Sequence, residues 1–161
     1  MEKMPIKRNE HIVKLSKDHH FTLLFCWKIR SGLKLKVEPE RIIKYVQYFW
    51  NKHMQPHFNE EETILFASVK NDAAVQKALN EHTQIQLQIK ALGSLANNAQ
   101  EELSALADTV DNHIRYEERE LFPHLERILS NEQLKVIGNQ LMSQHDPVSQ
   151  DNFADQFWLK K

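Results

Sequence analysis

Two short stretches of the chain carry histidine and glutamate at the same spacing. His57 precedes Glu61 by four residues and His113 precedes Glu117 by four, and each stretch continues with a second glutamate and a Leu-Phe pair. In a helix, residues i and i+4 lie one turn apart on the same face, so each pair can offer a ring nitrogen and a carboxylate oxygen to one point. One such pair alone is equally typical of a solvated face. Two in register indicate two equivalent halves that share a polar site.

Two more histidines lie singly on apolar stripes with helical spacing, His19 before the first pair and His82 before the second. A buried carboxylate without a partner costs several kcal/mol, and two together would repel, so dications are the expected partners. Imidazole with carboxylate suits iron, manganese or zinc rather than calcium or magnesium. Six side chains are too many for one tetrahedral zinc but suit two octahedral ions bridged by the glutamates. The predicted ligands are His19, His57, Glu61, His82, His113 and Glu117.

Other polar residues lie beside these ligands in the sequence. His20 falls beside Lys17 and off the apolar stripe, so His19 is the better ligand, and His20 and His53 are predicted to support the ligands. Metal binding and simple packing remain alternatives for His53. Glu62 and Glu118 point off the ligand face, where they contact either solvent or the ligands' remaining atoms. No histidine has a glutamate three residues before it, which excludes the Glu-x-x-His pattern of ferritin-like sites.

The elements that must position these residues are helices. The expected helices span about 10–30 (ending at Ser31-Gly32), 39–68, 72–93 and 97–128, with a shorter fifth from Ser130 to Asp146-Pro147. Long helices with short connections predict an all-α, up-down-up-down four-helix bundle over about 10–128, followed by a short helix and tail over 130–161, in a single domain of 1–161. Pro56 and Pro123 fall inside two of these helices and predict kinks there.

Composition supports a helical, globular protein. The chain has 161 residues, of which 3 are Gly and 5 are Pro. These are too few turn-forming residues for a β-sandwich or a β-barrel. Its formal charge of -1 shows no footprint for nucleic acid. The single cysteine, Cys26, and the lack of an apolar leader or of 18 consecutive apolar residues predict a cytoplasmic location and no membrane partner.

The residues from Leu15 to Leu125 resemble the hemerythrin-like, or HHE cation-binding, domain. The resemblance rests on Asp18-His19, His57-Phe-x-x-Glu61-Glu62, Glu81-His82 and His113-x-x-x-Glu117-Glu118-Arg-x-Leu-Phe-Pro123. It implies an up-down bundle holding two Fe ions with an oxo or hydroxo bridge, ligated by the six residues named above, with Mn or Zn as substitutes in vitro. The oxygen-carrying hemerythrins have a second histidine where this chain has Gln86, and an aspartate where it has Glu117, which weakens the case for oxygen storage.

Three functions follow as hypotheses. The first is a di-iron protein that binds or senses O2 or NO, or handles iron. The second is a di-iron redox enzyme of the oxidase, peroxidase or NO reductase type, whose redox partner the sequence does not name. The third is an iron-free scaffold in which the histidines only pack. The aromatic tail residues Phe153, Phe157 and Trp158 are predicted either to fold back on the bundle or to dock on the second subunit of a homodimer.

Overall fold

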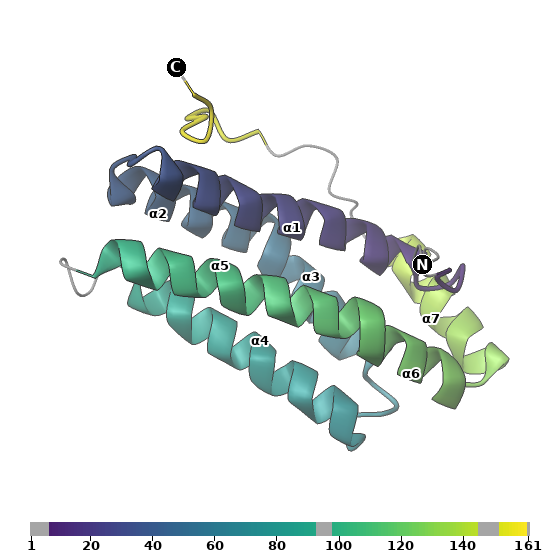
Figure 1. Ribbon diagram of the computed structural model, residues 1–161. Coiled ribbons are helices and arrows are strands. Elements are labelled where there is room, and N and C mark those ends of the chain that lie inside the picture. Colours follow the sequence, from purple (N-terminus) through teal and green to yellow (C-terminus); the bar gives the residue numbers. More distant parts are fainter. Residues whose placement is uncertain (1–6, 93–97, 145–151, 161) are drawn as a thin grey trace, which may run out of the picture.

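A computed structural model describes residues 7–92, 98–144 and 152–160 of the chain. All regular secondary structure within these ranges is helical, and four long helical rods lie alongside one another, with a shorter helix at one end (Figure 1). The expected helix ends at Gly93 and at Asp146-Pro147 lie outside the described residues. Among the residues described, no helix combines the length and apolar content needed to cross a membrane.

The first rod is α1, Val13–Lys34. The sequence predicts that it ends at Ser31-Gly32, and that prediction is wrong, because the helix continues through Gly32. A Cβ atom at Gly32 would lie 2.7 Å from ring carbons of Phe157 and 3.1 Å from Ile42. Glycine is therefore needed here for the close approach of another segment rather than for a helix end.

The second and fourth rods are each built from α-helical and π-helical segments in series. The second rod consists of α2 (Pro39–Phe49), η1 (Trp50–Met54), α3 (Gln55–Glu60) and η2 (Glu61–Leu65); the fourth consists of α5 (Ala99–Tyr116), η3 (Glu117–Leu121) and α6 (Phe122–Ile128). In the π segments the backbone hydrogen bonds span five residues instead of the four of an α-helix, an arrangement often found at functional sites. Here η2 begins at Glu61 and η3 begins at Glu117.

The prolines inside these rods follow π-helical segments. Pro56 and Pro123 occupy the second positions of α3 and α6, directly after η1 and η3. Proline lacks the N–H that an α-helix needs at its interior positions. The irregularity that the sequence predicts at each proline therefore takes the form of a π turn, and both rods continue past it.

Side-chain caps begin two of the remaining helices. The third rod, α4 (Ala73–Ala91), is capped by Asp72, whose Oδ1 accepts a hydrogen bond from the backbone N of Ala74 at 2.9 Å. The fifth helix, α7 (Asn131–Gln144), starts with a capping box in which Ser130 and Gln133 exchange backbone-to-side-chain bonds of 2.8 and 3.1 Å. Both starts were predicted from the sequence and are confirmed.

The apolar core is split into two clusters. One contains Phe25, Tyr45 and Phe49, and the other contains Leu15, Phe66 and Leu125. Along each of the four rods, the predicted ligand histidine lies between residues of the first cluster and residues of the second. The polar residues therefore meet in a layer with apolar packing on both sides.

The C-terminal tail packs on the outside of α1 and α2 (Figure 1). Phe157 and Trp158 are buried, and their ring centroids lie 5.6 and 5.5 Å from that of Tyr45. Ser31 Oγ donates a hydrogen bond to the carbonyl oxygen of Trp158 at 3.0 Å. Of the two arrangements expected for the aromatic tail, the structure shows the one in which it folds back on its own helices.

Candidate metal centre

The structure brings together all six residues that the sequence predicts as ligands. Each is buried, and the two glutamates have no exposed surface at all. They are His19 on α1, His57 on α3, Glu61 on η2, His82 on α4, His113 on α5 and Glu117 on η3. Four rods therefore contribute to one polar cluster.

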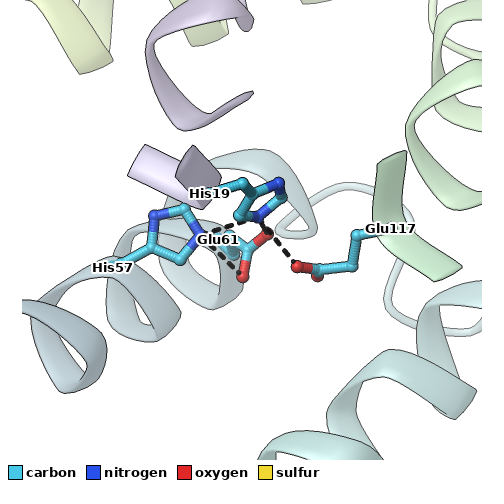
Figure 2. Close-up of side chains that lie close together, drawn as sticks. All are labelled: His19, His57, Glu61 and Glu117. Carbon is cyan, nitrogen blue, oxygen red and sulfur yellow. Dashed lines mark hydrogen bonds and ion pairs between the residues drawn. The ribbon is translucent and has the colours of Figure 1, made fainter. Parts of the chain in front are cut away.

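The first half of the cluster contains His19, His57, Glu61 and Glu117, whose candidate ligand atoms all lie within 4.8 Å of one another. Nε2 of His19 lies 3.1 Å from Oε1 of Glu117, and Nε2 of His57 lies 3.4 Å from Oε1 of Glu61. Figure 2 shows these two rings and two carboxylates pointing toward a common space. One metal ion could contact a donor atom from each of them.

The second half contains His82 and His113 together with the same two glutamates, again within 4.8 Å. Nε2 of His82 lies 3.2 Å from Oε1 of Glu61, and Nε2 of His113 lies 3.2 Å from Oε1 of Glu117. Each half thus has two histidines of its own, while both glutamates belong to both halves. The two groups, each of which could hold a metal ion, therefore overlap at both glutamates.

On the other edge of each ring, Nδ1 meets a carboxylate. The four pairs are His19 with Glu118 at 2.7 Å, His57 with Asp18 at 3.0 Å, His82 with Glu62 at 3.3 Å and His113 with Glu81 at 2.8 Å. In the neutral imidazole, a carboxylate at Nδ1 keeps the proton on that nitrogen and leaves the Nε2 lone pair facing the centre. All four rings are therefore oriented for Nε2 ligation.

These four carboxylates form a cycle, of which the sequence analysis anticipated only Glu62 and Glu118, as residues that contact either solvent or the ligands. Asp18 is next to His19 in the chain, but its carboxylate contacts Nδ1 of His57 on the following rod. In the same way, Glu81 is next to His82, but its carboxylate contacts Nδ1 of His113. Likewise, Glu62 and Glu118 follow the shared glutamates and hold the histidines of α4 and α1. The signal that could have identified them is the acidic residue directly beside each ligand.

Aromatic rings from the repeated stretches pack against the histidines. Phe122 stacks on His19 with centroids 5.3 Å apart, and Phe66, at the equivalent position of the other half, stacks on His82 at 6.2 Å. Phe58 also stacks on His82, with centroids 3.8 Å apart and planes 7° from parallel. The His82 ring is therefore packed between aromatic neighbours and the carboxylate at its Nδ1 atom.

The two supporting histidines predicted from the sequence lie away from this cycle. His20 is exposed, and its ring contacts Phe21 with centroids 5.6 Å apart. His53 is half-buried and packs against the rings of Tyr48 and Phe49. The described contacts of the four central imidazoles go to the acidic residues, to phenylalanine and to one another instead.

The electrostatics of the cluster favour positive charge at its centre. Burial alone would lower the pKa of His57 and of His113, but the surrounding carboxylates outweigh it and raise these pKa values to about 10 and about 9. Burial would likewise raise the pKa of Glu117, yet its three histidine neighbours hold that pKa well below its usual range. Glu117 thus remains ionised in the interior and attracts cations.

The donor atoms themselves also fit metal ions. In the described part of the chain, both side-chain oxygens of Glu61 and of Glu117 and Nε2 of His82 and His113 are buried and face one another at ion-pair distances without forming a regular hydrogen bond. Buried polar atoms in folded proteins almost always have partners, and groups of them without any call for an explanation such as an ion. A mixed set of imidazole nitrogen and carboxylate oxygen fits iron, manganese or zinc.

The fold and the site define an all-helical protein with a buried histidine and glutamate cluster suited to metal cations. The hemerythrin HHE cation binding domain matches residues 10–125, and the chain belongs to this family. The resemblance seen in the sequence is thereby confirmed.

One curated relative extends the comparison. The chain is 26% identical over 126 residues to a protein described as a DNA nickase from Nostoc sp. (strain PCC 7120). The match covers 74% of this chain but 36% of that protein, so the chain spans about a third of its relative's length. No solved structure matches the chain.

Proposed function

We propose that the chain binds two iron ions side by side, with His19 and His57 on one ion, His82 and His113 on the other, and Glu61 and Glu117 shared. The observation that carries this proposal is that the two ligand groups have both glutamates in common. The rods would then form the up-down-up-down bundle of the family, as part of a single cytoplasmic domain.

The centre's surroundings favour a small ligand. Iron would supply reversible ligand binding and electron transfer, while the chain's residues orient the donors in a buried layer between two apolar clusters. A diatomic such as O2 or NO could penetrate such a layer, whereas a larger polar substrate could reach no further than the surface hollow beside His82. We infer that the protein binds or senses O2 or NO, or handles iron.

Metal content and spectroscopy test this proposal. Protein purified without chelator, or reconstituted with Fe(II) under anaerobic conditions, should contain about two ions per chain by elemental analysis. Admission of O2 or NO should then produce visible absorption bands. Protein that binds no metal, or that stays colourless and spectrally unchanged, would refute the di-iron centre.

The same preparation separates binding from catalysis. Stoichiometric reaction with O2, NO or peroxide indicates a binding or sensing protein. Repeated turnover with an added electron donor indicates the redox-enzyme alternative, in which the chemistry belongs to the metal and the protein provides positioning.

The description of the Nostoc relative concerns DNA, whereas the sequence analysis expects no nucleic-acid partner. Because the match covers 36% of that protein, its activity can depend on the other parts of its chain. With a formal charge of -1, this chain carries little net attraction for phosphates, and the expectation stays a prediction. A gel-shift assay with plasmid DNA at low salt tests it.

A further inference from the structure

Glu62 and Glu118 occupy equivalent positions in the two halves of the repeat, and each holds the Nδ1 atom of a central histidine. Their remaining surroundings differ. Side-chain exposure is 43% for Glu62 and 26% for Glu118. The two halves of the cluster therefore have similar ligands at the centre, but the carboxylates that contact their outer ring edges differ in solvent exposure.

The outside of the first half is closed by an arginine. Arg8 has a side-chain exposure of 4%, and its Nη2 lies 2.9 Å from Oε2 of Glu118. The other oxygen of Glu118 accepts a hydrogen bond from Ser16 Oγ at 2.6 Å. Arg8 also lies over the ring of Phe122, 5.3 Å from its centroid, and that ring stacks on His19. A buried positive charge therefore covers the side of His19.

The outside of the second half is open. Within the described ranges, the carboxylate of Glu62 makes one polar contact, to His82 at 3.3 Å. It faces a surface pocket of about 470 Å³. The pocket wall includes Phe58, Asn59, Glu62, His82, Thr83 and Gln86. A ligand residue of the second half thus forms part of a water-accessible hollow, and no arginine or lysine among the described residues pairs with the carboxylate beside it.

The chemistry of this hollow suits a hydrated divalent cation. The side chains of Asn59, Thr83 and Gln86 offer amide and hydroxyl oxygens, which can bind metal-bound waters, and Glu62 adds a negative charge. A cleft of one sign raises the local concentration of the opposite ion. On the other side, the guanidinium of Arg8 is buried and pairs with the carboxylates of Glu118 and Glu126, so it occupies the space beside Glu118 that a cation would need.

We propose that this pocket is the port through which divalent metal ions reach the centre and leave it. The carboxylate of Glu62 attracts the ion into the pocket before His82 binds it. The proposal rests on the metal centre proposed above. In it, the position held by His82 and His113 fills from the pocket, and Arg8 keeps the His19 side closed.

The rate of metal uptake by the full chain tests the port. Metal-free protein is mixed with Co(II), uptake is followed by the visible absorption of the bound ion, and the final content is measured by elemental analysis. Glu62→Gln keeps an oxygen for His82 and removes the charge, and should slow uptake about tenfold at low ionic strength. Asn59→Asp adds a carboxylate to the same wall and should speed it. Both differences should shrink at high salt, because exposed charges are screened.

Glu132→Gln is the matched control, since it removes one exposed carboxylate from α7, which contributes nothing to the pocket wall. It should take up Co(II) at the wild-type rate. Equal uptake rates in wild type, Glu62→Gln and Asn59→Asp, with two ions bound in each, would overturn the port and leave the metal centre intact. A rate change in Glu132→Gln as large as that in Glu62→Gln would also overturn it, because net charge alone would then govern uptake. Wild-type protein that takes up no ion would refute the centre and the port together.

Discussion

Asp18 holds the imidazole of His57 on the following rod, with 3.0 Å between Oδ2 and Nδ1, although its neighbour in the chain is another predicted ligand, His19. The same displacement by one rod occurs at Glu81, which holds His113 at 2.8 Å. Each rod thus orients a ligand that the next rod supplies, so the geometry of the cluster depends on all of them at once.

Replacing Asp18 with asparagine should weaken metal binding without abolishing it. Asparagine can still accept a hydrogen bond from Nδ1 of His57. The loss of the negative charge makes the imidazole a weaker metal ligand, and such changes lower metal affinity about 10–100-fold. Competition with a chromophoric chelator measures the affinity. Asp108→Asn is the control, because Asp108 is 65% exposed and pairs with Arg30 on the surface. Equal affinities in the two variants would contradict a supporting role for Asp18.

The shared glutamates should behave differently from the histidines. Glu117→Gln removes a donor from both ligand groups, so both ions should bind more weakly. His57→Asn affects only one group and should leave about one ion per chain at moderate metal concentration. Elemental analysis after dialysis gives both numbers. Retention of a single tightly bound ion by Glu117→Gln would show that the two positions are independent.

Metal-free and metal-loaded protein should respond to pH in opposite ways. Without metal, the pKa values of His57 and His113 are raised to about 10 and about 9, because their carboxylate partners outweigh burial. Since both values lie above the ordinary 6.5, this stabilisation is complete below about pH 6.5 and is lost as pH rises through 9 to 10. Metal ligation instead requires neutral imidazole, so the loaded form should lose its ions on acidification.

Thermal unfolding tests both directions. The metal-free protein should have a lower Tm at pH 10 than at pH 6.5, and His57→Asn should reduce that difference. The loaded protein should show its largest gain in Tm over the metal-free form at alkaline pH. A metal-free protein that becomes more stable as pH rises from 6.5 to 10 would contradict the charge arrangement described for the cluster.

The effect of Gly32→Ala on the free energy of unfolding should change sign when Phe157 is replaced. In the wild type, the new methyl group would meet the ring of Phe157 at 2.7 Å, and overpacking of this kind costs about 1–3 kcal/mol in unfolding free energy. In a Phe157→Ala background the ring is absent, and alanine should stabilise the helix by up to about 1 kcal/mol through its higher propensity. Denaturant unfolding of the four proteins gives the coupling energy. Identical effects of Gly32→Ala in both backgrounds would show that the tail does not press on α1.

Local physical chemistry explains how much could be predicted from the sequence. The helices follow from apolar residues at helical spacing, and the starts of α4 and α7 follow from caps that lie within three residues of the bonds they make. The i, i+4 spacing of His57 with Glu61 and of His113 with Glu117 places donor pairs on one helix face, whatever surrounds it. The internal repeat then indicates that two such faces serve one site.

Only the tertiary structure decided which groups meet across the rods. The carboxylates that contact the rings lie 20 to 99 residues away from their histidines, so no local pattern shows which carboxylate contacts which ring. The π turns at Glu61 and Glu117 were not predicted from the sequence, and Gly32 ends a helix or admits a ring depending on what packs against it. Local spacing specifies the face of a helix that a residue occupies, whereas the packing of one helix on another selects the atoms that reach it.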